Sequence, residues 1–229
     1  MINSKGMSHT LFVGCLLALT GGFLDVYTYV CRGGVFANAQ TGNLVLLGIK
    51  LVEGEFVQAF FYVIPVIAFV IGVIISDAVR MRFLNIDKFH WRHIIILVEI
   101  LALIVAGIIP QNRVNNMIIN IIISFICSLQ VQSFRMINGN ILATTMCTGN
   151  LRSTAELIFK YSKEKNPQQK RSIITYLSVL ICFVLGAVIG AIFCYLINNR
   201  AIFVPSVFLI VVFIVMFIGT NQKRKIKKD

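Results

Sequence analysis

Apolar runs long enough to cross a lipid bilayer recur along this chain and limit what it can fold into. A transmembrane helix needs about 20 mostly apolar residues. Of the 229 residues, 58% are hydrophobic and 13% charged, against roughly 45–50% and about 25% in soluble domains. The sequence therefore predicts an all-α integral membrane protein with six transmembrane helices. The spans are expected at Thr10–Val30, Val57–Val79, Ile94–Ile109, Met117–Ile137, Ile173–Ile197 and Ala201–Gly219.

Basic residues concentrate in alternate connections between these runs. The Arg80–Arg92 loop, the Lys160–Arg171 loop, the tail after Asn221 and Lys5 together hold 15 of the 21 Lys and Arg residues. Because cytoplasmic loops are enriched in Lys and Arg, these regions and both termini are expected in the cytoplasm. The net charge of +12 therefore reflects membrane orientation, and we expect no nucleic-acid partner.

A short motif occurs twice, once in each half of the chain. Thr41-Gly42-Asn43-Leu44 is repeated as Thr148-Gly149-Asn150-Leu151, 107 positions later, and each half reads span, TGN segment, span, span. Two halves with three spans each insert in opposite senses, as in the inverted repeats of many transporters. The sequence thus predicts a 3+3 inverted repeat with halves at 1–112 and 113–220, followed by a basic cytoplasmic tail at 221–229.

The two TGN segments, roughly 33–51 and 138–160, cannot both cross the membrane without moving a basic loop to the outside. A re-entrant segment in each half, which enters the membrane and returns to the same face, resolves the conflict. Non-helical backbone at that depth requires burial in protein or a wet cavity.

Each TGN motif suits the start of a helix inside the membrane. Thr is a good N-cap, Gly allows a sharp turn, and Asn bonds to nearby backbone. Two helix N-termini near the midplane would form a site for an anion or polar solute. The alternative is a pair of packed turns whose polar groups are all satisfied by protein. The candidate binding residues are Asp25, Asn38, Thr41, Gly42, Asn43, Gln132, Thr148, Gly149 and Asn150.

Asp25 is a carboxylate inside the first apolar run, where it needs a partner, water or a transported proton. Its counterpart 107 positions later is Gln132. Arg135 and Arg152 are candidate partner charges, and Glu156 follows Arg152 by one helical turn. The alternative places Arg135 at the cytoplasmic edge and makes Arg152–Glu156 a local pair.

Catalytic and metal-binding patterns are absent from the sequence. It contains no nucleophile elbow, phosphate-binding glycine loop or HExxH motif. The six cysteines have no ligand spacing, so they are interpreted as small apolar residues. We therefore expect no enzyme activity, no metal and no cofactor.

The chain resembles the YoaK-type family of uncharacterised bacterial multi-pass membrane proteins. The resemblance is carried by residues 21–25 (GGFLD), 33–38 (GGVFAN), 130–132 (QVQ) and the two TGNL motifs. Where that family often has a Gly-x-Gln-Asn-like stretch, this chain has SLQV at 128–131. The resemblance implies a location in the bacterial inner membrane and supplies no substrate.

Two function hypotheses follow from these observations. The first is a secondary transporter or channel for a small polar or anionic solute, with Asp25 orienting the solute or carrying a proton. The second is a non-transporting membrane partner or assembly protein in which the TGN segments only pack. The expected partners are the lipid bilayer, the solute and a second copy of the chain.

Overall fold

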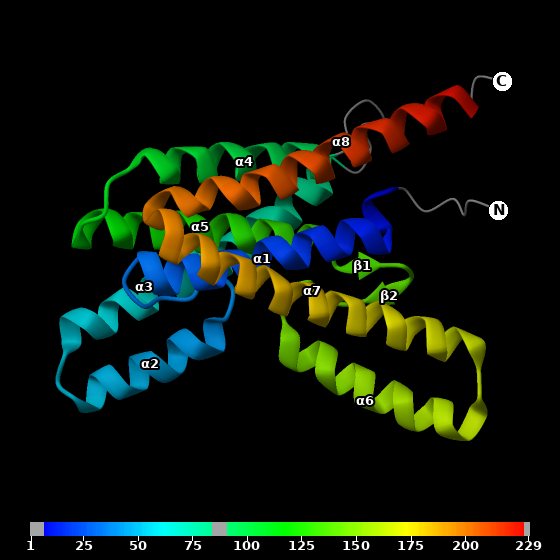
Figure 1. Cartoon of the computed structure of the whole chain (residues 1–229), viewed down its shortest axis with the longest axis horizontal. Helices are drawn as coiled ribbons and strands as arrows, with labels where there is room; N and C mark the ends of the chain where they lie inside the picture. Colours follow the sequence, from blue (N-terminus) through cyan, green and yellow to red (C-terminus); the bar gives the residue numbers. More distant parts are fainter. Residues whose placement is uncertain (1–6, 84–90, 227–229) are drawn as a thin grey trace.

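The computed structural model describes residues 7–83 and 91–226, which form eight α-helices, two short 3-10 helices and one small hairpin (Figure 1). The elements are η1 (Met7–His9), α1 (Leu11–Cys31), α2 (Gln40–Val52), α3 (Phe56–Phe83), α4 (Trp91–Ile108), α5 (Arg113–Ser133), β1 (Met136–Ile137), β2 (Asn140–Ile141), α6 (Cys147–Glu164), α7 (Pro167–Ile197), η2 (Asn198–Ile202) and α8 (Phe203–Ile226).

Five segments among these residues are long and apolar enough to cross a membrane. Four of them correspond to α1, α3, α4 and α5. The fifth, Pro167–Gly219, covers 53 residues and contains both α7 and most of α8, with η2 between them. Figure 1 shows the chain reversing direction at this junction. These apolar helices confirm the expectation of an all-helical, multi-pass integral membrane protein.

Glycines bring α1 and α7 into backbone contact along their length (Figure 1). A Cβ on Gly22 would overlap the carbonyl oxygen of Phe183, and one on Gly186 would overlap that of Leu19. Small residues allow helix backbones to approach this closely, which strengthens packing where no hydrophobic effect operates. Since Gly190 meets Phe23 farther along both helices, α1 and α7 run parallel.

A second parallel pair is formed by α3 and α5. A Cβ on Gly72 would clash with Ser128 and with the backbone of Phe125. Farther along both helices, the Ser76 and Ser133 hydroxyls are 3.1 Å apart. The helices of this pair thus also meet through small and hydroxyl-bearing residues.

The remaining long helices, α4 and α8, pack against each other in antiparallel fashion. His93 meets Phe213 edge to face, with ring centroids 5.6 Å apart, and Gly107 lies against Phe203 at the other end. The main apolar cluster includes Leu24 of α1, Leu103 of α4 and Leu209 of α8. This cluster fixes the long helices around α1.

An arginine marks each end of the bundle, and we name the ends after them. The Arg32 end contains Arg32 itself, which follows the last residue of α1, together with the start of α3 and the turn from α4 to α5. At the Arg92 end lie η1, the end of α3, the start of α4 and the end of α5. The chain therefore leaves α1 and enters α3 at the same end of the bundle.

The helices α2 and α6 are the TGN segments, and they lie on the same side of the bundle, pointing apart (Figure 1). Each packs mainly on the long helix that follows it, α2 on α3 and α6 on α7. At the end of α2, Lys50 pairs with Glu53 at 2.6 Å and Glu55 at 3.0 Å. Hydrogen bonds to these two carboxylates raise the pKa of Lys50 to about 12.

The prediction for the fourth span was wrong at its end. We expected Met117–Ile137, but α5 begins at Arg113 and ends at Ser133. Residues after it form a hairpin in which Asn138 and Gly139 have φ of 50° and 84°. Asn-Gly supports the two positive φ angles of a tight hairpin turn, so this local signal outweighs the apolar character of Met136 and Ile137.

We predict that Gly186→Ala destabilises the protein by about 1–3 kcal/mol, because the added methyl overlaps a backbone carbonyl of α1 that cannot rotate away. Thermal unfolding of the detergent-solubilised protein measures the change. Gly48→Ala in α2 is the control, since a Cβ there meets nothing within 4 Å. Equal melting temperatures for the two variants would contradict the assigned α1–α7 contact.

Candidate functional site

Asp25 binds the backbone at the break that precedes α2. Its Oδ1 accepts hydrogen bonds from the amides of Asn38 at 2.6 Å and Ala39 at 3.3 Å. The Asn38 side chain in turn donates to the carbonyl of Gly21 at 3.4 Å. Because Gly21 lies ten residues before Cys31, the end of α1, and a helix rises 1.5 Å per residue, the break lies about 15 Å inside the Arg32 end.

This carboxylate binds the two amides that lead into the N-terminus of α2, those of Asn38 and Ala39. Ala39 occupies the cap position and has no side chain able to accept a hydrogen bond. Helix N-termini carry free amides and partial positive charge, both of which a carboxylate stabilises. The described residues give Asp25 no ion pair, so these amides supply the charge compensation expected from Arg135 or Arg152.

Two acceptor atoms at this break are buried without a hydrogen-bond partner: Oδ2 of Asp25 and Oδ1 of Asn38. Asp25 is only 5% exposed and Asn38 only 6%. A cavity of about 240 Å³ lies beside Asp25, walled mostly by apolar residues of α1, the break and α7. Asp25 contributes to the wall of this space, whereas Asn38 does not, and both unpaired oxygen atoms are buried.

The second break is the non-helical segment between β2 and α6, and it contacts the same place on α1. A Cβ on Gly21 would overlap the methyl of Thr145 and lie 3.7 Å from the amide nitrogen of Asn38. Thr145 and Asn38 are counterparts at the 107-residue offset. The two breaks therefore converge on Gly21, one helical turn from Asp25.

The asparagines of the two TGN motifs make the same contact in each half. Asn43 Nδ2 donates to the carbonyl of Phe36 at 2.8 Å, and Asn150 Nδ2 donates to that of Ala143 at 2.7 Å. Each acceptor lies seven residues earlier in the chain. Asn43 Oδ1 also accepts from the Phe36 amide at 2.9 Å. Both asparagines hold the non-helical segment that leads into their helix.

The other TGN residues lie at the surface of the bundle. Thr41, Thr148 and Gly149 are exposed. Gly42 faces the ring of Phe36, whose carbons a Cβ would meet at 2.8 Å, whereas a Cβ on Gly149 would meet nothing within 4 Å. This difference follows from the smaller Ala143 that replaces Phe36 in the second half.

The remaining predicted residues lie apart from Asp25 in separate contacts. Gln132 donates to Asp77 at 2.7 Å, and Arg135 lines a pocket at the Arg92 end. Arg152 bonds to Glu156 at 2.9 Å as an exposed pair one helical turn apart. The structure thus brings together Asp25, Asn38 and the two breaks, and separates the other charges from them.

One buried carboxylate was given no role in the sequence analysis. Glu99 of α4 is fully buried; its Oε1 accepts from Gln130 at 3.0 Å, and its Oε2 has no partner. Its position inside an apolar run was the signal, since a carboxylate there is costly unless it binds a proton or a partner. Its partner Gln130 lies on a different helix, α5, so the bond between Glu99 and Gln130 could not be predicted from the residues around Glu99.

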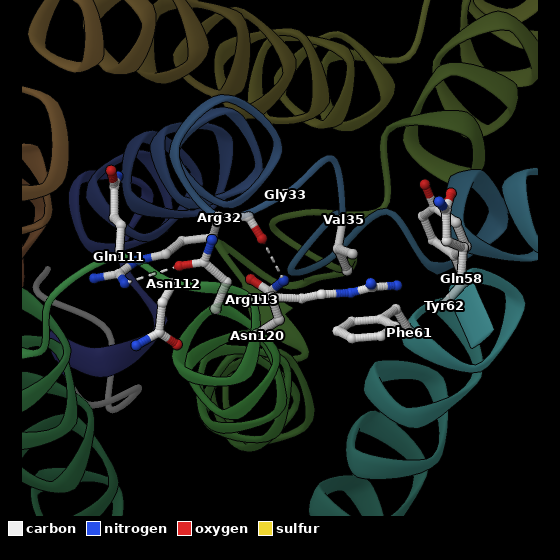
Figure 2. A pocket seen from close by; sticks show the side chains of 11 residues that line it. Arg32, Gly33, Val35, Gln58, Phe61, Tyr62, Gln111, Asn112, Arg113 and Asn120 are labelled. Carbon is white, nitrogen blue, oxygen red and sulfur yellow. Dashed lines mark hydrogen bonds between the residues drawn. The ribbon is translucent and has the colours of Figure 1, made fainter.

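A polar pocket of about 410 Å³ opens at the Arg32 end (Figure 2). Arg32 is 1% exposed and donates to Tyr27, Asn116 and the carbonyls of Ala106 and Ile109. It therefore satisfies the C-terminal carbonyls of α4, where positive charge is favoured.

The open part of this pocket is lined by a different arginine. Figure 2 shows Arg113 extended over the ring of Phe61, toward Gln58 and Tyr62, while Arg32 points the opposite way. The guanidinium carbon of Arg113 lies 5.1 Å from the Phe61 centroid, within the range of cation–π attraction. Arg113 thus presents a positive charge and hydrogen-bond donors at this end of the bundle.

We predict that Asn43→Leu costs about 2–5 kcal/mol and Asn150→Leu about 1–3 kcal/mol, since the first leaves both Phe36 backbone groups unpaired and the second leaves one carbonyl. Thermal unfolding in detergent ranks the two. Exposed Thr41→Ser serves as the control, with a change within about 0.5 kcal/mol. A larger loss for Asn150→Leu than for Asn43→Leu would refute the assigned contacts.

Comparison with known proteins agrees with the family resemblance seen in the sequence. The family model described as "Protein of unknown function (DUF1275)" matches residues 13–215. The UPF0700 transmembrane protein YoaK of Bacillus subtilis (strain 168) is 28% identical over 186 residues, covering 77% of this chain and 80% of YoaK. No solved structure matches. The chain therefore belongs to the DUF1275 family of transmembrane proteins, whose function is unknown.

Proposed function

We propose that the protein is a secondary transporter or channel for a small polar or anionic solute, built as a 3+3 inverted repeat and coupled to protons at Asp25. Its termini lie in the cytoplasm, the Arg92 end of the bundle faces the cytoplasm, and the Arg32 end faces outward. The two TGN segments are re-entrant, and their helix starts form the solute site near the midplane.

The packing of the long helices supports an inverted repeat. Exchanging α1 with α5, α2 with α6, α3 with α7 and α4 with α8 turns the α1–α7 contact into α5–α3, the α2–α3 contact into α6–α7, and the α1–α8 contact into α5–α4. The contact between α4 and α8 maps onto itself. Because Arg32 at the end of α1 bonds Asn116 near the start of α5, these equivalent helices run in opposite directions, as inversion requires.

The geometry at the first break supports the re-entrant segment. The chain enters at the Arg32 end, reaches Gly21 about 15 Å inside, and returns through the 13 residues of α2 to the start of α3 at the same end. A depth of about 15 Å is half of a typical hydrocarbon core. Asn43 and Asn150 stabilise the two breaks by equivalent bonds.

The observation that carries the proposal is the buried Asp25 carboxylate, whose Oδ1 accepts from the two amides just before α2, those of Asn38 and Ala39, while Oδ2 has no partner. Protonation at Oδ2 removes the negative charge and weakens the hold on the amides of Asn38 and Ala39. Those amides then bind an anionic or hydrogen-bond-accepting solute at the helix N-terminus. A proton and a solute thereby load together, which couples their movement.

A second candidate, a non-transporting membrane partner or assembly protein, is favoured by the surface position of the TGN residues. Thr41, Thr148 and Gly149 are exposed. The side chains of Asn43 and Asn150 already donate hydrogen bonds to backbone carbonyls. In this reading Asp25 is only the cap of α2. The two candidates differ in whether Asp25 exchanges protons as solute moves.

For the topology, we expect single cysteines at Glu53 and Arg200, in a variant without the six native cysteines, to react with a membrane-impermeant thiol reagent in intact cells. A cysteine at Lys163 is expected to react only after the membrane is opened. All three positions are exposed. Labelling of Glu53 and Lys163 from one side, with Arg200 protected, would show that α2 crosses the membrane and would exclude the re-entrant arrangement.

For transport, we expect wild-type proteoliposomes to show proton uptake, reported by an internal pH dye, upon addition of a transported solute. The solutes to test are small inorganic anions, carboxylates and neutral polar compounds. Asp25→Asn keeps the size of the side chain but cannot exchange a proton, so solute-dependent acidification is expected to fall at least tenfold.

The matched control for this assay is Asp77→Asn. Asp77 is bonded to Gln132 near the Arg92 end, and an asparagine oxygen preserves that bond. Full activity in both variants would exclude proton coupling at Asp25. Absence of flux with every solute, together with stable recovery of another protein with the purified chain, would favour the assembly protein.

A further inference from the structure

A basic pocket lies at the Arg92 end and has no part in the proposed transport site. Its volume is about 540 Å³, and three arginines from different elements line it: Arg80 of α3, Arg92 of α4 and Arg135 after α5. His9 and Met136 also contribute to the wall. Positive charge from three segments of the chain therefore converges on one pocket.

Arg92 is held in place at the back of this pocket. Its Nε donates to the carbonyl of Ser133 at 2.9 Å, and its Nη1 donates to Ser8 Oγ at 2.7 Å. Nη1 also lies 2.9 Å from His9 Nε2, while His9 Nδ1 donates to the carbonyl of Met136 at 2.7 Å. Because a guanidinium only donates, His9 Nε2 accepts this bond and the imidazole is neutral. The site is thus preorganised around a fixed cation.

The charges in the pocket are not balanced by the residues that the structure describes. No carboxylate is among its lining residues, and the nearby Asp77 of α3, bonded to Gln132, supplies one negative charge against three arginines. Arg80 and Arg92 lie near enough to repel each other. The side chains of Arg80 and Arg135 make no hydrogen bond or ion pair within residues 7–83 and 91–226. Like charges held together in this way are stabilised by an anion.

We propose that this pocket binds a phosphoryl group, as inorganic phosphate or as the headgroup of an anionic phospholipid. Planar guanidinium groups match phosphate oxygens in pairs, and three of them balance more than one negative charge. The pocket lies where the long apolar helices end, which is the level of lipid headgroups, and basic pockets between helices on the cytoplasmic side bind such headgroups. Trp91 and Met136 provide an apolar wall for the rest of a lipid.

The test compares wild-type protein with an Arg80→Gln/Arg135→Gln double variant. Neither side chain has a described bond to lose, and Arg92, which holds Ser133, is left intact. The control is Arg113→Gln, which removes one exposed arginine from the pocket at the opposite end. Each full-length protein is purified in detergent and checked for a monodisperse elution profile and for its melting temperature.

Two probes distinguish the sources of the phosphoryl group. Inorganic phosphate is titrated calorimetrically, with chloride at the same ionic strength as the reference. Native mass spectrometry then counts retained lipid after exchange into vesicles of phosphatidylglycerol or of phosphatidylcholine. Loss of two charge-assisted bonds is expected to weaken binding by at least about tenfold in the double variant.

Phosphate binding that the double variant loses, and Arg113→Gln keeps, supports a site for a free phosphate. Retention of phosphatidylglycerol over phosphatidylcholine, lost in the double variant only, supports a lipid headgroup site. If neither probe binds wild type, or if both bind the double variant as tightly as wild type, the proposal is overturned. These outcomes do not depend on transport.

Discussion

The bond between the Asp25 carboxylate and the amides of Asn38 and Ala39 is the interaction on which the interior of this protein depends. Non-helical backbone deep in an apolar bundle has no water to satisfy it. A side chain from α1 supplies that satisfaction at the first break, and the amide group of Asn43 supplies it from the other side. The break, the start of α2 and the polar face of α1 are therefore one unit, in which removal of any member leaves buried groups unpaired.

Close helix packing places this unit. Gly22 and Gly186 let α1 and α7 touch through their backbones, and Gly72 does the same for α3 on α5. Lipid tails are as apolar as the helices, so such contacts, rather than the hydrophobic effect, hold the helices together. Thr145 and Asn38 meet at Gly21, which directly precedes Gly22, so one stretch of α1 serves both the close helix packing and the candidate site.

Local patterns in the sequence were sufficient for much of the fold. The apolar runs located α1, α3, α4, α5 and the α7–α8 stretch, and the two TGN motifs located α2 and α6 as separate elements. The end of α5 was missed because Met136 and Ile137 continue the apolar pattern into a hairpin whose Asn138-Gly139 turn is a short signal. Asp25 and Asn38 were proposed for one site, and they are bonded. The residues that bond to the side chains of Arg32 and Glu99 lie up to 84 positions away, so their pairing could not be predicted from motif spacing in the sequence.

The pairing of α1 with α7 has a consequence for how the chain is made. Gly22 packs against Phe183, which lies 161 positions later in the chain. Because ribosomes add about 5–20 residues per second, Phe183 is synthesised roughly 8–30 s after Gly22. During that interval Asp25 is inserted without the helix that covers its neighbours. The α1–α7 contact can therefore form only after most of the second half of the chain has been synthesised.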